Sequence, residues 1–245
     1  MEPSWVLIPA HNNSDLLQAC LISVLNQTIP CRIFSINNGS IDNIPSVLAG
    51  LGNKHIVVNA YPQLGVAGAW NYGLRYLFNA RGKAAKSVLV INSVLVINQD
   101  VILRPDTYEL LNREEGEFVT AVSTGDKSKL LCNLQKSSGN KRPHPDFSCF
   151  RITRECFETV GPFDEGFYPA WFEDNDYHVR MAKAGIEACC IDLPFYHYAG
   201  GTIKRAREQG VANYYDVAFR ANQERFHNKW GVLPGTKEYE KLCQG

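Results

Sequence analysis

The chain has 245 residues, of which 45% are hydrophobic and 20% charged, an ordinary composition for a globular protein with a substantial core. Its 25 basic side chains balance its 25 acidic ones, which argues against a protein held mainly by nucleic-acid phosphates. The N-terminus lacks the regions of a signal peptide, and no apolar run approaches the ~20 residues of a membrane span. The eight cysteines form no CxxC pair. The sequence therefore predicts a cytoplasmic protein with reduced thiols.

Strand and helix signals alternate through the first hundred residues. Strands are expected at residues 5–10, 33–36, 55–58 and 88–97, and helices at residues 14–26, from about 42, and at 66–79. Such alternation is typical of a parallel, doubly wound sheet, in which ligands bind at the carboxyl ends of the strands. The last strand carries the hexapeptide SVLVIN twice, at residues 87–92 and 93–98. Because two copies exceed the usual length of a strand, only the second is expected to reach the site.

The second half of the chain has a looser pattern. Strands are expected at residues 117–123, 147–152 and 186–191, helices from 153 or 154, at 173–183 and at 213–229, and loops at 126–142 and 161–172. No linker rich in proline, glycine or serine divides the chain. We therefore expect a single domain over residues 1–245, with a nucleotide-sugar-binding half at 1–103 and an acceptor-binding half at 104–245 that carries the catalytic base.

Two separated segments contain candidate metal ligands. Asn98-Gln99-Asp100 directly follows an apolar strand, and a carboxylate in this place can hold a divalent cation that bridges two phosphates. Taken alone, an Asp that closes a strand is more often a turn residue. His197 also follows a strand, and it gains meaning only if it converges on Asp100. A carboxylate, a neutral imidazole and diphosphate oxygens form a sensible ligand set for Mn²⁺ or Mg²⁺.

An acidic run, Glu173-Asp174-Asn175-Asp176, opens the helix expected at residues 173–183. Capping of the helix N-terminus explains one or two of these carboxylates. It explains less well why Tyr168, Trp171 and Phe172 flank them. Aromatic rings stack on the apolar faces of sugars, and a carboxylate can deprotonate a hydroxyl, so the run favours a sugar site.

Together, over residues 5–231, these segments resemble the inverting glycosyltransferases of the GT-A fold, specifically glycosyltransferase family 2. VLIPAHNN is similar to the family's first strand and nucleotide-contacting loop. Residues 37–42 resemble its Asp-Asn-Gly-Ser-x-Asp turn, with Asn37 in place of the base-binding Asp. Residues 63–73 resemble its glycine-containing segment, and residues 98–100 the Asp-x-Asp metal motif in the Asn-x-Asp form of rhamnosyltransferase-like members. Residues 161–165 and 172–176 resemble the segment that supplies the base.

The resemblance implies a Rossmann-like, doubly wound α/β fold with a mixed sheet flanked by helices. It implies transfer of a hexosyl or deoxyhexosyl group from a UDP-, dTDP- or GDP-sugar to an acceptor hydroxyl. Asp174 takes the position of the catalytic base, and Asp100 and His197 take those of the ligands of Mn²⁺ or Mg²⁺. The implied donor contacts are Pro9, Ala10, His11, Asn12, Asn37, Asn38, Gly65, Asn71, Asn98 and Gln99. The implied acceptor contacts are Trp171, Phe172, Glu173 and Asp176.

Several alternatives remain open at this point. A glycan or glycoconjugate acceptor is favoured, but a locally basic segment keeps a hydroxymethylated base in DNA as an alternative; it contains Lys127, Lys129, Lys136, Lys141, Arg142 and His144. Basic residues after His197 either close over the diphosphate or form a solvated helix face; they are Lys204, Arg205 and Arg207. The missing first Asp of the metal motif also fits a nucleotide-sugar-binding protein without catalysis. The joint presence of Asp100, Asp174 and His197 favours an enzyme.

Overall fold

The computed structural model describes residues 4–53, 55–79, 91–131, 145–198, 200, 210 and 212–244. Within them, one sheet has the strand order β3-β2-β1-β4-β7-β6-β8-β5. The strands are β1 (Ser4–Ala10), β2 (Cys31–Asn38), β3 (Ile56–Ala60), β4 (Ser93–Ile97), β5 (Val101–Ile102), β6 (Phe118–Thr124), β7 (Cys149–Thr153) and β8 (Ala188–His197). The helices are α1 (Ser14–Leu25), α2 (Ile44–Ala49), α3 (Gly65–Asn79), α4 (Thr107–Arg113), α5 (Arg154–Val160), α6 (Glu173–Lys183), α8 (Ala212–Trp230) and α9 (Lys237–Leu242), with a 3₁₀ turn at Lys127–Leu131.

The N-terminal strands form the parallel part of the sheet. β1 pairs in parallel with β2 and with β4, and β2 pairs in parallel with β3. The carboxyl ends of these strands therefore meet at one edge, as the alternation of strands and helices predicts. The second SVLVIN copy supplies β4, whereas residues 91 and 92 of the first copy lie outside any strand and its residues 87–90 lie outside the described part of the chain.

The C-terminal strands make the sheet mixed. β7 runs antiparallel to both β4 and β6, β8 runs parallel to β6, and β5 pairs antiparallel with β8. The mixed α/β fold expected from the sequence is thus confirmed. The starts of β7 and β8 each lie two residues later than predicted. The amide of Ser148 binds the Asp146 carboxylate in a turn that delays β7 to Cys149, and the amide of Ile186 binds the carbonyl of Met181 at the end of α6.

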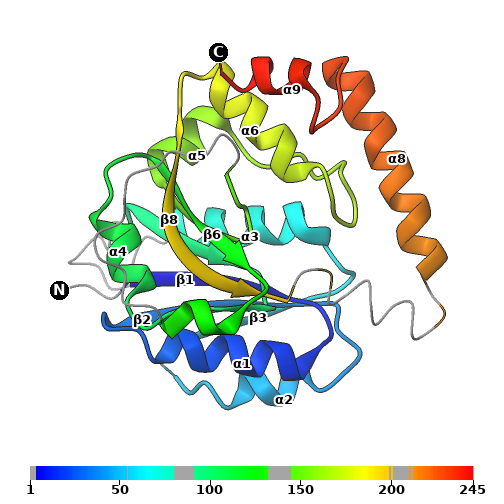
Figure 1. The fold of residues 1–245 in the computed structure, drawn as a ribbon. Coiled ribbons are helices and arrows are strands. Elements are labelled where there is room, and N and C mark those ends of the chain that lie inside the picture. Colours follow the sequence, from blue (N-terminus) through cyan, green and yellow to red (C-terminus); the bar gives the residue numbers. More distant parts are fainter. Residues whose placement is uncertain are drawn as a thin grey trace.

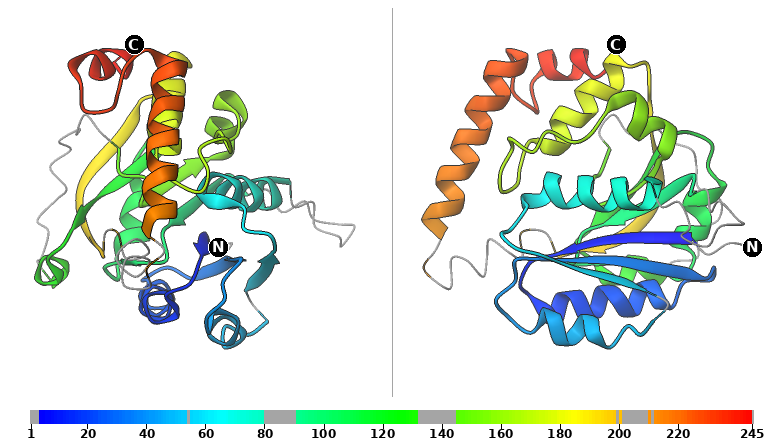
Figure 2. Two further views of the ribbon diagram at one scale, coloured as in Figure 1. Left: turned by 90° about the vertical axis from the view of Figure 1, so that its right-hand side faces the viewer. Right: turned by 180° about the vertical axis from the view of Figure 1, so that it is seen from behind.

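Helices cover both faces of the sheet, with α1 and α2 on one face and α3 on the other (Figures 1 and 2). The alternation of β1 explains both contacts, because successive side chains of a strand point to opposite faces. Leu7 belongs to the core beneath α3, and Val6 and Ile8 belong to the core beneath α1. Apolar burial on both faces therefore fixes the sheet between two helical layers.

The long helix α8 lies at the side of the molecule (Figure 1) and shares an apolar cluster with α6 and α9. Phe226 of α8 is fully buried in a separate apolar cluster with Phe172, Val179 and Tyr239. This cluster attaches the C-terminal segment to the start of α6, where the acidic run lies. None of the helices in the described ranges is both long enough and apolar enough to cross a membrane.

Candidate active site

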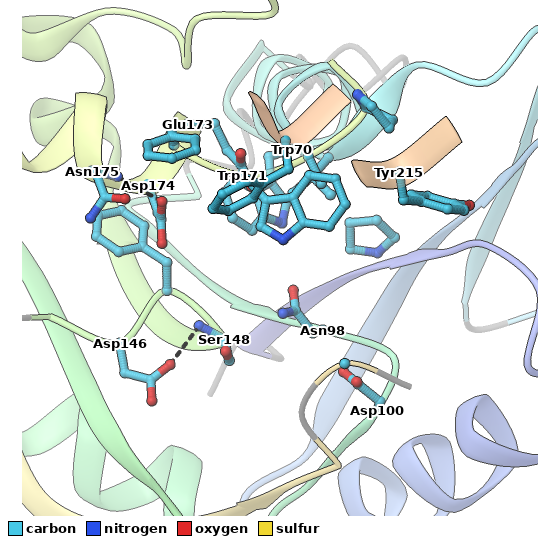
Figure 3. Close-up of a pocket in the computed structure, with 18 of the residues that line it drawn as sticks. Trp70, Asn98, Asp100, Asp146, Ser148, Trp171, Glu173, Asp174, Asn175 and Tyr215 are labelled. Atoms are coloured by element: carbon cyan, nitrogen blue, oxygen red, sulfur yellow. Dashed lines mark hydrogen bonds between the residues drawn. The ribbon is translucent and has the colours of Figure 1, made fainter. Parts of the chain in front are cut away.

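A cavity of about 970 Å³ opens at the carboxyl ends of the parallel strands, a size typical of small-molecule sites. It extends from the edge of the sheet to the start of α6 and to α8 (Figure 3). The predicted site residues that line it are Pro9, Ala10, His11, Asn38, Asn98, Gln99, Asp100, Trp171, Phe172, Glu173, Asp174 and His197. The predicted residues outside its lining are Asn12, Asn37, Gly65, Asn71 and Asp176. Residues more than 70 positions apart in the sequence thus share one cavity.

The buried Gln99 side chain ties the end of β4 to the loop after β1. Its Oε1 accepts from the His11 amide at 2.7 Å, and its Nε2 donates to the carbonyls of His11 and Asn12, each at 2.9 Å. His11 Nδ1 in turn lies 2.9 Å from the carbonyl oxygen of Asn38 at the end of β2. These bonds hold three strand ends in a fixed arrangement, so Gln99 shapes this side of the cavity through the backbone.

Asp100 and His197 lie side by side at this edge. The Asp100 Oδ1 and His197 Nε2 atoms are 3.3 Å apart, and both side chains are mostly buried. The two-residue strand β5 causes this proximity, because it pairs Val101 with His197. Burial alone would lower the pKa of His197, but its hydrogen bond to Asp100 and the charges of Asp100 and Asp146 raise it.

The donor set fits a divalent cation, since it offers one carboxylate and one imidazole at a strand edge. Within the described ranges, three or more His, Cys, Asp or Glu side chains nowhere gather closely enough to hold a metal together. A cation at Asp100 and His197 would therefore need further ligands from outside these side chains.

The start of α6 presents its first two carboxylates to the cavity. Trp171 and Phe172 precede them with left-handed φ values of 75° and 73°, a conformation that non-glycine residues rarely adopt and that often marks functional sites. Burial and the charge of Asp174 raise the pKa of Glu173 well above its ordinary value, and the Oε2 atom of Glu173 has no hydrogen-bond partner. Burial is also the main reason why the pKa of Asp174 is raised.

Asp176 has a different environment from its neighbours in the acidic run. It is fully buried and receives Arg180 Nε at 2.8 Å, Lys229 Nζ at 2.7 Å and Trp230 Nε1 at 2.9 Å. These three partners satisfy its charge and connect α6 with α8. The Asp176–Arg180 pair follows from the helical spacing of four residues. Asp176 thus fastens the two helices and does not face the cavity.

Three other residues outside the cavity lining support the loops that form it. Asn71 donates to the carbonyl of Phe163 at 2.9 Å and accepts its amide at 2.8 Å, which fixes the loop after α5. Asn37 donates to Asn59 Oδ1 and accepts from the Ser40 amide. The side chain of Asn12 accepts from the amide of residue 41 at 2.9 Å. The side-chain amides of these three asparagines thus form hydrogen bonds to the backbone or to a neighbouring side chain.

Gly65 joins three parts of the site at the start of α3. Its carbonyl accepts from Asn38 Nδ2 at 3.0 Å, and the next amide, of Val66, donates to the carbonyl of Pro169 at 2.8 Å. The φ of Gly65 is +71°, and a Cβ here would lie 2.9 Å from the Pro169 oxygen. Only glycine fits both the backbone conformation and this close approach.

We therefore expect Gly65→Ala to destabilise the protein by about 1–3 kcal/mol, because it combines a strained φ with a backbone contact. The midpoint of thermal unfolding should fall by several degrees. Gly125→Ala is the matched control, since a Cβ at Gly125 meets nothing within 4 Å. Equal unfolding midpoints for the two variants would contradict the role of Gly65.

Aromatic rings surround the mouth of the cavity beside α8. The Trp171 ring lies edge-on to Tyr215 and Phe219, with ring centroids 6.0 and 5.7 Å apart. Asn222, buried on α8, holds the loop that carries Trp171. Its Nδ2 atom lies 3.2 Å from the carbonyl oxygen of Tyr168 and 2.7 Å from that of Ala170. The strained Trp171 is thus kept in place by a side chain more than 50 residues away.

We expect Asn222→Ala to lower the free energy of unfolding by about 1–3 kcal/mol, since buried carbonyls lose their donor. Hydrogen exchange of the amides in residues 166–172 should accelerate at the same time, because local opening becomes easier. Asn228→Ala, at an exposed position of the same helix, should change neither. Unchanged exchange at residues 166–172 in Asn222→Ala would exclude this holding role.

Sequence reasoning missed Asp146, which also lines the cavity (Figure 3). The amides of Ser123 and Ser148 bind its carboxylate at 3.2 and 2.9 Å, and its charge acts on both Asp174 and His197. The sequence places it at the end of a polar loop without any motif. Only the antiparallel pairing of β7 with β4 brings it to the strand ends.

Some of the basic residues for which the sequence suggested a binding role lie outside the described part of the chain. They are Lys136, Lys141, Arg142 and His144 of the basic segment, and Lys204, Arg205 and Arg207 after His197. Of the basic segment, Lys127 and Lys129 are described and exposed. Lys127 Nζ lies 4.8 Å from the centre of the Tyr196 ring.

Residues 5–118 match the model of the family described as Glycosyl transferase family 2. A "Galactofuranosyl glycosyltransferase" from Leishmania donovani is 49% identical to this chain over 73 residues. That alignment covers 28% of this chain and only 17% of the relative. Residues 5–118 span the parallel strands and the first helices described above.

Two solved structures resemble nearly the whole chain. The mannosyltransferase PcManGT from Pyrobaculum calidifontis, in complex with GDP-Man and Mn²⁺, has a TM-score of 0.59 at 16% identity, with 99% of this chain and 85% of that chain covered. S. aureus TarS 1–349, in complex with UDP-GlcNAc, has a TM-score of 0.60 at 12% identity, with 99% of this chain and 70% of that chain covered. Residues 5–118 are thus similar to glycosyl transferase family 2, and the chain has the GT-A fold of these structures.

Proposed function

We propose that this protein is an inverting, metal-dependent glycosyltransferase that moves a sugar from a nucleoside diphosphate to a hydroxyl of a glycan or glycoconjugate. One observation carries the proposal: a single cavity has Asp100 and His197 on one side and Asp174 on the other (Figure 3). Asp100 and His197 are suited to bind the diphosphate end of a donor, and Asp174 is suited to act as a base. The family match over residues 5–118 supports the same reaction.

On the donor side, Asp100 and His197 are the residues that would hold Mn²⁺ or Mg²⁺, and the loop fixed by Gln99 would contact the nucleotide. A bound divalent cation would neutralise the charge that develops on the departing diphosphate. Asn98 and His11 line the same side and offer polar groups to phosphate or ribose oxygens. The N-terminal half thus serves as the nucleotide-sugar-binding half.

On the acceptor side, Asp174 would take the proton of the acceptor hydroxyl. As the hydroxyl oxygen forms a bond to the anomeric carbon, the bond from that carbon to the diphosphate oxygen breaks, and its electron pair leaves with the diphosphate. A single displacement of this kind inverts the anomeric configuration and requires no enzyme nucleophile. The raised pKa of Asp174 suits this role, because a more basic carboxylate accepts a proton more readily.

The rings around the mouth favour a sugar-containing acceptor. Trp171, Tyr215 and Phe219 offer apolar faces next to the carboxylates of α6. The aromatic faces can pack against the apolar face of a sugar ring, and the neighbouring polar groups can bind its hydroxyls. The buried Glu173 carboxyl, whose Oε2 atom has no hydrogen-bond partner, adds a group that can bind a hydroxyl. The Asn-x-Asp motif favours the donor sugar of rhamnosyltransferase-like enzymes. The name of the Leishmania relative makes a galactofuranosyl group a second candidate.

A screen of thermal unfolding tests the proposal. UDP-, GDP-, CMP- and dTDP-sugars, including a nucleotide-linked galactofuranose, are added with Mn²⁺ or with a chelator. A donor that binds the native state should raise the unfolding midpoint only when the metal is present. Slow release of nucleoside diphosphate from that donor should follow. No shift with any donor, or equal shifts with the chelator, would refute a metal-dependent transferase.

A further inference from the structure

A second, smaller cavity of about 170 Å³ adjoins the main one at the start of α6. Asp174 and Asn175 line both cavities, as do Pro234 and Gly235 of the segment before α9. Asp174 therefore stands at the junction of the two. The volume of the smaller cavity is on the scale of one sugar ring.

The walls of the smaller cavity combine polar and apolar groups. Asn175 Nδ2 lies 3.3 Å from the Tyr239 hydroxyl, and His178 Nδ1 lies 3.3 Å from the same oxygen. These three side chains line the cavity together with Phe147 and Pro234. An amide and a hydroxyl both donate and accept, so they match sugar hydroxyls of either orientation. An aromatic side chain beside them suits the apolar face of a sugar ring.

The position of Asp174 decides which sugar this cavity would take. In an in-line displacement the attacking hydroxyl approaches from the side opposite to the leaving diphosphate. Asp100, a candidate diphosphate ligand, lies across the main cavity from Asp174 (Figure 3), and His197 lies beside Asp100. A group that reaches the base from the smaller cavity thus comes from the side away from those ligands.

We propose that the smaller cavity holds the sugar ring of the acceptor that bears the attacking hydroxyl; this inference rests on the proposed function. Asn175, His178 and Tyr239 determine which hydroxyl faces Asp174. The main cavity then holds the donor sugar, and its aromatic mouth holds further parts of the acceptor. The segment before α9 and α9 itself therefore contribute to acceptor specificity.

Ligand-observed saturation-transfer NMR with methyl glycosides of glucose, galactose and mannose tests this assignment. The samples contain Mg²⁺ and the nucleoside diphosphate selected by the unfolding screen, or no nucleotide if none is selected. Asn175→Leu and Tyr239→Phe each remove a hydrogen-bonding group and keep the approximate size of the side chain. The backbone amide of residue 175, which binds Asp174 Oδ1 at 2.7 Å, is retained in Asn175→Leu. Asn228→Leu, exposed on α8, is the matched control.

We expect at least one methyl glycoside to bind the unchanged protein and the Asn228→Leu control. Its dissociation constant should rise about tenfold in Asn175→Leu and in Tyr239→Phe, the usual effect of one lost hydrogen bond. The shift in unfolding midpoint caused by the nucleotide should be the same in all four proteins. Equal glycoside binding in all of them, or no binding to the unchanged protein, would each overturn the assignment.

The nucleotide measurement separates two kinds of failure. If the nucleotide still stabilises the unchanged protein, a negative glycoside result removes only the acceptor cavity. If no nucleotide stabilises it, the proposed function itself fails, whatever the glycosides do. A normal unfolding midpoint for Tyr239→Phe shows that a loss of glycoside binding does not come from a loss of folding.

Discussion

Replacing Asp174 with Asn should leave nucleotide-sugar binding nearly unchanged and slow transfer by roughly 10²–10⁴-fold, the usual contribution of a positioned base. Asn keeps the size of the side chain and its oxygen, so the bond from the Asn175 amide at 2.7 Å can remain. Release of nucleoside diphosphate, with an acceptor or with water in its place, measures the change. A base must be deprotonated to accept a proton. Because burial raises the pKa of Asp174, the activity of the unchanged enzyme should fall on acidification, and this loss should begin at a higher pH than an ordinary Asp would cause.

The same substitution at two other aspartates provides the controls. Asp176→Asn should mainly lower stability, because it weakens a buried carboxylate that binds Arg180, Lys229 and Trp230. Asp192→Asn, at an exposed position of β8, should change neither stability nor transfer. Glu173→Gln should cost less transfer than the Asp174 change and should raise the acceptor KM. Full transfer by Asp174→Asn would show that Asp174 is only part of a helix terminus.

Sequence patterns predicted the parallel half of the fold well. β1, β2, α1 and α3 each follow a local apolar periodicity, and their observed bounds lie within about two residues of the prediction. The helix α6 has the predicted bounds, because the acidic first turn and the Gly185 turn mark its ends locally. The N-cap residue of α1 is Asn13, which has a left-handed backbone conformation and makes no capping hydrogen bond with its side chain.

The missed features depend on contacts between distant segments. β5 has only two residues, too few for a periodic signal, yet its pairing with β8 brings Asp100 to His197. Asp146 gains its place from the pairing of β7 with β4. The acidic run shows the same limit, since Glu173, Asp174 and Asp176 look alike in the sequence. Their environments differ only because Lys229 and Trp230 of α8 reach Asp176.

Replacing Asp100 with Ala should abolish metal-dependent binding of the nucleotide. A direct ligand should matter at least as much as outer partners, whose loss costs about 10–100-fold in metal affinity. The fold should persist, because the bond from the Tyr198 amide to the Asp100 backbone carbonyl, at 3.0 Å, does not involve the side chain. Calorimetric titration with the nucleoside diphosphate, with Mn²⁺ and with a chelator, measures the effect, and an unchanged unfolding midpoint without ligand confirms the fold.

His197→Ala should weaken the same binding less than Asp100→Ala does. Water can replace one nitrogen ligand, whereas the carboxylate also supplies the negative charge that a divalent cation requires. Asp192→Ala, on the exposed side of β8, serves as the control for a lost carboxylate near His197 in sequence. If Asp100→Ala bound the nucleotide and Mn²⁺ with unchanged affinity, the metal would have to lie elsewhere. Asp146, which faces the same cavity, would then be the next carboxylate to replace.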